Sequence, residues 1–172
     1  MRATFKTFFF SLSLLSILIR CNTFSPGTLG SFQKWRFPIP EKQFDSEVNA
    51  FFKNNPQYLV PGKWEHLDSW KQNGYGSLNG RIFYFSSHPE EIYYVSYSAD
   101  VEEFEDEKKS KSTTVSVRAV NLGEEGAWPT VEDLEKNEKE IHRIDDRFYK
   151  QIVTKLEKQA NVKSEKYSHW YE

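Results

Sequence analysis

The pattern of apolar and polar residues is clearest between residues 80 and 121, where it predicts three consecutive β-strands. β-branched and aromatic residues dominate all three runs, and turn residues separate them. The predicted strands cover residues 81–86, 91–98 and 113–120. In the third strand, Val115, Val117 and Ala119 alternate with polar residues, which is typical of a strand with one buried face. We therefore expect an antiparallel sheet.

Helical periodicity flanks these strands on both sides. Phe44, Val48 and Phe51 recur at helical spacing and predict a short helix over residues 41–54. A longer apolar stripe predicts a helix over residues 130–159 with Thr130 as its N-cap. The stripe consists of Leu134, Ile141, Ile144, Phe148, Ile152 and Leu156. Such a stripe requires a flat apolar partner, and the predicted sheet provides one.

Three segments have weaker patterns. Residues 35–40 contain two prolines and predict an extended segment that packs on the edge of the domain. Apolar and polar residues follow no regular spacing over residues 63–70, and we expect a short edge strand there. The tail from residue 162 to 172 either frays or adds a last strand. The predicted fold class is α+β, with an antiparallel sheet of three to five strands and one short N-terminal and one long C-terminal helix packed on one face.

The N-terminus has the pattern of a secretory signal. Residues 8–19 form an uncharged, largely apolar run, and the basic residues Arg2 and Lys6 precede it. The run is shorter than the roughly 20 apolar residues of a membrane-spanning helix. The sequence therefore predicts export through a signal segment.

This signal segment leads directly to Cys21, the one cysteine of the chain. In this respect the N-terminus resembles a bacterial lipoprotein precursor. Leu18 matches that family's preferred residue three positions before the cysteine, whereas Arg20 stands where the family has Gly, Ala or Ser. The resemblance implies lipidation of Cys21, cleavage before it, and a membrane anchor on the non-cytoplasmic side of the cell envelope. The alternatives are cleavage by an ordinary signal peptidase between Cys21 and Ser31, or an uncleaved anchor.

The chain then divides into a signal peptide (1–20), a lipid-proximal tether (21–34) and a single α+β domain (35–172). Loss of residues 1–20 removes three positive charges and changes the net charge from −2 to −5. This balance argues against nucleic-acid binding, and it gives no electrostatic attraction to anionic lipid. A single cysteine excludes an internal disulfide.

Candidate chemistry is sparse. No histidine has a partner at zinc-ligand spacing, and no phosphate-binding glycine motif is present, so we predict no metal, no cofactor and no catalytic residue. An alternative is an exported hydrolase with a site near His66, Asp68 and Ser69, although no G-x-S-x-G pattern surrounds the serine.

Four aromatic residues are candidate binding residues because they fall in or beside predicted loops: Trp64, Trp70, Tyr75 and Trp128. Core packing is the competing interpretation for each of them. The leading hypothesis is a non-enzymatic envelope protein that binds another protein or a surface ligand. The hydrolase is one alternative to this hypothesis. The other alternative is a module that holds a hydrophobic ligand between the long helix and the strands.

Overall fold

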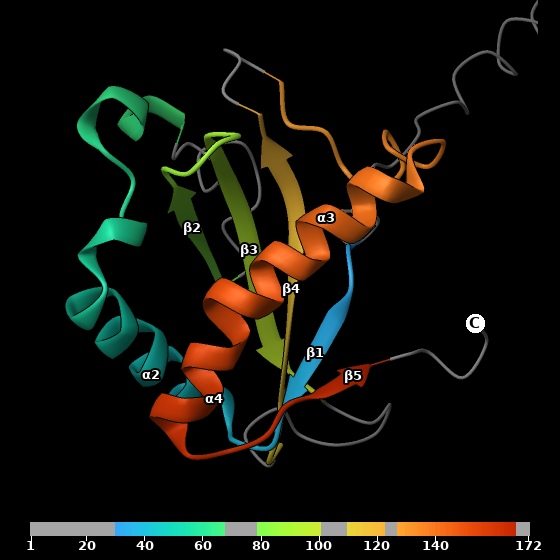
Figure 1. The fold of residues 1–172 in the computed structure, drawn as a ribbon. Helices are drawn as coiled ribbons and strands as arrows, with labels where there is room; N and C mark the ends of the chain where they lie inside the picture. Colours follow the sequence, from blue (N-terminus) through green and yellow to red (C-terminus); the bar gives the residue numbers. More distant parts are fainter. Residues whose placement is uncertain (1–29, 68–78, 101–109, 123–126, 168–172) are drawn as a thin grey trace, which may run out of the picture.

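A computed structural model describes residues 30–67, 79–100, 110–122 and 127–167. Within these ranges the chain forms a five-stranded antiparallel sheet with helices against one face, which confirms the predicted α+β class (Figure 1). The strands are β1 (Lys34–Phe37), β2 (Asn79–Phe85), β3 (Glu91–Ala99), β4 (Thr113–Asn121) and β5 (Glu165–Tyr167). The three strands expected from the sequence correspond to β2, β3 and β4.

The strand order is β2-β3-β4-β1-β5, so the first strand lies inside the sheet. The prediction that residues 35–40 pack on the domain edge is wrong, because β1 pairs with β4 on one side and with β5 on the other. Trp35 and Phe37 are buried, whereas Lys34 and Arg36 alternate with them on the opposite face. Burial of two large aromatic side chains explains why this short strand occupies an internal position.

Helix α2 (Glu41–Asn54) has the predicted bounds and buries Phe44, Val48 and Phe51. The long helix consists of α3 (Glu138–Phe148), a π-helical turn η5 (Tyr149–Val153) and α4 (Thr154–Ala160). It crosses the sheet diagonally beside α2 (Figure 1). Ile144, Phe148 and Ile152 are almost completely buried beneath it.

The long helix begins eight residues later than predicted. Residues 131–136 form turns, and Thr130 is not a helix cap. Asn137 is the N-cap instead, because its side chain accepts a hydrogen bond from the backbone N–H of Glu140. At the other end, Asn161 adopts a left-handed conformation and the N–H of Val162 bonds the carbonyl of Glu157, as in a Schellman motif.

The opposite face of the sheet carries a smaller apolar cluster. Leu67, Ile82, Ile92 and Tyr94 form its buried part. The sequence predicted an edge strand over residues 63–70. This prediction is wrong for residues 63–67, which belong to the 3-10 helix η2 (Gly62–Leu67), and residues 68–70 lie outside the described residues. A helical turn lets this segment place Leu67 onto the sheet.

The fold also includes residues that the sequence assigned to the tether. Phe32 is buried in the main core, and its N–H donates to the carbonyl of Val117. Lys34 begins β1. The packed domain therefore includes residues 32–34.

Candidate functional site

The predicted site residues fall into two groups. Cys21, Trp70, Tyr75, Asp68 and Ser69 lie outside the described residues. Lipidation of Cys21 therefore stays a prediction, and so do the hydrolase alternative and the binding roles of these two aromatic residues.

Trp64 and Trp128 lie against the same cluster in the structure. Both are half-buried and pack against the small apolar cluster on the sheet face opposite the helices. The indole N–H of Trp64 donates to Oε1 of Glu90 at 3.3 Å. The binding role of Trp64 and Trp128 stays a prediction.

His66 is exposed on η2, with its ring centroid 6.3 Å from that of Trp64. The space between the long helix and the central strands is filled by Ile144, Phe148 and Ile152. A hydrophobic ligand at that interface would have to displace these side chains.

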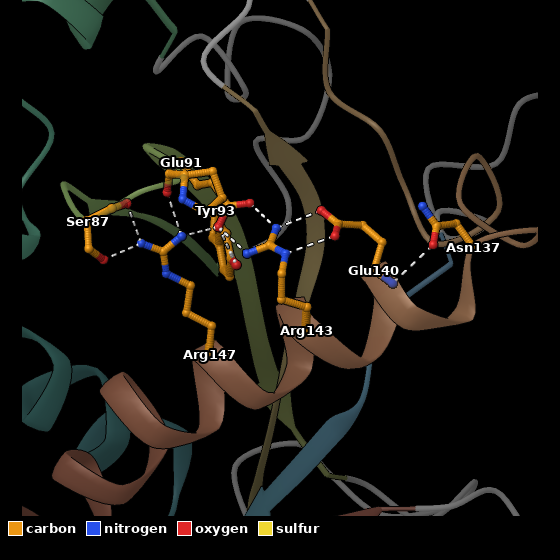
Figure 2. A network of polar contacts seen from close by, with 8 residues as sticks. Ser87, Glu91, Tyr93, Asn137, Glu140, Arg143 and Arg147 are labelled. Carbon is orange, nitrogen blue, oxygen red and sulfur yellow. Dashed lines mark hydrogen bonds and ion pairs between the residues drawn. The ribbon is translucent and has the colours of Figure 1, made fainter.

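A buried polar cluster is centred on the carboxylate of Glu91, at the start of β3. Glu91 is completely buried, and Arg143 and Arg147 reach it from α3 (Figure 2). The hydroxyl of Tyr93 donates to its Oε2 at 2.9 Å, and Arg143 Nη1 donates to the same oxygen at 3.1 Å. Burial is the main cause that raises the pKa of Tyr93 above its ordinary value, and the Glu91 charge adds to it.

The same two arginines fix neighbouring groups. Arg147 also donates to the carbonyls of Pro89 and Ser87, at 2.7 and 2.9 Å. Arg143 also bonds Glu140, which raises the pKa of the guanidinium and lowers that of the Glu140 carboxyl. Both oxygens of Glu91 accept hydrogen bonds from protein donors, so the cluster holds α3 against the start of β3.

A pocket of about 540 Å³ lies between the long helix and the β1–β5 pair. This volume is typical of small-molecule sites. We call it the β1–α3 pocket and define it by its lining residues: Gln33, Trp35, His142, Asp145, Asp146, Tyr149, Lys150, Ser164 and Lys166. Tyr149 opens the π-helical turn η5, and such turns occur frequently at functional sites.

Asp145 is the partly buried carboxylate of this pocket. Its Oδ1 accepts the backbone N–H of Gln33 at 2.9 Å, which ties α3 to the entry of β1. Burial raises the pKa of Asp145, and the Gln33 hydrogen bond opposes that shift. The neighbouring Asp146 is mostly exposed and pairs with Lys150 at 2.7 Å, which lowers its pKa.

Aromatic rings form the apolar part of the pocket. Trp35 and Tyr149 stack with centroids 4.6 Å apart, and the ammonium of Lys166 lies 5.6 Å from the Trp35 centroid. The Trp35 indole N–H is buried and has no hydrogen-bond acceptor within the described part of the chain. The pocket therefore combines a fixed aromatic pair with carboxylate, ammonium, amide and hydroxyl groups.

Sequence reasoning missed this pocket because its residues come from three distant segments. They meet only when β1 inserts between β4 and β5. One local signal was available: Asp145, Asp146, Tyr149 and Lys150 recur at helical spacing beside the apolar stripe.

Comparison with family models, curated proteins and solved structures found no match to this chain. Among the described residues, none of the helices has both the length and the apolar character needed to cross a membrane. The same residues contain no cluster of three or more His, Cys, Asp or Glu side chains suited to a metal ion.

Proposed function

We propose that this protein is an exported, lipid-anchored cell-envelope protein that acts by non-covalent binding, with the β1–α3 pocket as its ligand site. The observation that carries the binding role is the pocket itself. Its polar groups line one cavity between the long helix and the β1–β5 pair, and both the long helix and β1 are packed into the same core. Groups held on rigid elements bind without a large ordering cost, which is the requirement for a binding site.

The membrane attachment rests on the N-terminal segment. An apolar run over residues 8–19 leads directly to the single cysteine, Cys21. Stable anchoring requires more than one acyl chain, and a diacylglyceryl group on the thiol supplies two. The packed domain starts about ten residues later, with Phe32 in its core.

Acyl labelling tests the anchor. The full-length chain and its Cys21→Ser variant are expressed in a bacterial host that is fed an alkyne analogue of palmitate, and the membranes are then fractionated. We expect label and membrane retention for the parent chain and neither for the variant. Unlabelled protein that is cut beyond Cys21 would contradict the anchor.

A further inference from the structure

We infer that the β1–α3 pocket binds a neutral saccharide through Asp145 and Lys166, an inference that rests on the proposed binding role. Seven of its nine lining residues are polar or charged, and the remaining two are the stacked pair Trp35 and Tyr149. A lining of this kind favours a ligand that presents many hydrogen-bonding groups and some apolar surface. Sugar rings have hydroxyl groups at their rim and C–H groups on their faces.

The charges of the pocket favour a neutral ligand. Asp145 and Asp146 balance Lys150 and Lys166, so the lining has no net charge while His142 is neutral. Asp146 and Lys150 already form an ion pair with each other. The pocket therefore has no excess positive charge for a phosphate and no excess negative charge for a metal or polyamine.

The remaining pair, Asp145 and Lys166, sets the hydrogen-bonding pattern. A carboxylate has about four acceptor positions, and the N–H of Gln33 occupies one on Asp145. Because Asp145 is partly desolvated, additional donors from a ligand would stabilise its charged form. The Lys166 ammonium has three donors and lies 5.6 Å from the centroid of the Trp35 ring, so it can donate hydrogen bonds to acceptors on a ligand in the pocket.

A hydroxyl group donates one hydrogen bond and accepts others, so neighbouring hydroxyls on a sugar ring meet both requirements. The Asp145 carboxylate accepts from one hydroxyl, and the Lys166 ammonium donates to the next. Gln33 and His142 provide additional polar groups at the rim. An apolar ligand would displace water from the Asp145 carboxylate without replacing its hydrogen bonds, which disfavours binding of such a ligand.

Ligand-observed saturation-transfer NMR tests this inference on the full chain in a phosphocholine detergent, because sugar-headed detergents would compete. The probes are glucose, galactose, mannose, N-acetylglucosamine and the disaccharides maltose, lactose, cellobiose and chitobiose. We expect at least one of them to bind. Asp145→Asn and Lys166→Gln should each weaken that binding by about tenfold, the effect of losing one charge-assisted hydrogen bond.

Two matched variants control for charge. Glu135→Gln and Lys158→Gln remove the same charges at exposed positions outside the pocket and should leave the affinity unchanged. Lys166 is exposed, so Lys166→Gln carries the test even where Asp145→Asn does not fold. Absence of binding by all eight sugars, or equal binding by parent and pocket variants, would overturn the saccharide inference.

Glycine and alanyl-alanine serve as zwitterionic comparison ligands. If they bind through Asp145 and Lys166 while the sugars do not, the ligand class is wrong but the proposed binding role stands. Acyl labelling of Cys21 is independent of these titrations, so failure of the anchor is distinguished from failure of the ligand class.

Discussion

Glu90 and Glu91 are neighbours in the chain, yet their carboxylates bond to layers on opposite faces of the sheet. Glu91 meets Arg143 and Arg147 of the long helix, whereas Glu90 accepts hydrogen bonds from Tyr84 and Trp64 at 2.6 and 3.3 Å. Successive side chains of a strand point to opposite faces, so two adjacent acids can reach both layers. The start of β3 thus connects the long helix on one side with η2 on the other.

Glu91→Gln should destabilise the fold by about 3–5 kcal/mol, because it removes the carboxylate partner of the buried Arg147 and leaves Arg143 with Glu140 alone. Chemical denaturation of the parent and variant chains measures this loss. Glu140→Gln is the matched control, since Glu140 bonds the same Arg143 but is partly exposed. Glu140→Gln should lower the free energy of unfolding by about 1 kcal/mol or less. Similar losses for both variants would contradict a special role for Glu91.

The Glu90 carboxylate should contribute to acid sensitivity. Hydrogen bonds from Lys63, Tyr84 and Trp64 lower its pKa from 4.5 to about 2. Because the pKa is lower in the folded chain, the stabilisation is fully present above pH 4.5 and is lost as the pH falls toward 2. Thermal melting of Glu90→Gln across this range should show a shallower loss of stability than the parent chain. An identical slope for both chains would contradict the assignment.

Tyr93 and Tyr97 should resist ionisation in alkali. Burial raises the pKa of both hydroxyls above the ordinary value of 10.0, and hydrogen bonds to Glu91 and Asp45 act in the same direction. The folded state therefore holds these protons more tightly, and its stability falls as the pH rises above 10.0. Ultraviolet titration should show that Tyr93 and Tyr97 ionise only as the chain unfolds, and Tyr93→Phe should reduce the number of such tyrosines by one. Ionisation of all tyrosines before unfolding would contradict this expectation.

Phe148→Ala should cost about 3–5 kcal/mol, because the ring is almost fully buried against Phe83 and leaves a cavity when removed. Lys150 lies two residues further along the same helix, and its side chain is mostly exposed. Lys150→Ala should therefore change the free energy of unfolding by no more than about 0.5 kcal/mol. Urea denaturation of both variants provides the measurement. A small loss for Phe148→Ala would mean that the long helix is not packed on the sheet as described.

Local periodicity was sufficient to predict much of this fold. The strands β2–β4 and helix α2 follow from alternation and helical spacing within single segments, and the structure confirms them. The apolar stripe predicted the buried face of the long helix from Ile141 onward. It did not predict the helix start, because Leu134 continues the spacing while a turn precedes the cap at Asn137. The position of that boundary is set by the capping side chain of Asn137 and not by the hydrophobic pattern.

The internal position of β1 could not be predicted from its own four residues. Its location depends on pairing with β4 and β5, which are far away in the sequence. The β1–α3 pocket exists only because of that pairing, so the sequence directed attention to loop tryptophans instead. Glu91 was missed for a related reason: it shares the core-facing phase of Tyr93 and Val95, but its arginine partners lie about fifty residues away.

Fluorine NMR of the fluorotryptophan-labelled full chain tests most directly whether the β1–α3 pocket is the ligand site. The chain has five tryptophans, and Trp35→Phe identifies the Trp35 resonance. We expect a saccharide to shift the Trp35 signal and Lys166→Gln to weaken this shift, while the signals of Trp64 and Trp128 stay in place. A shift at Trp64 or Trp128 with no change at Trp35 would place binding on the opposite sheet face and would show that the β1–α3 pocket is not the ligand site.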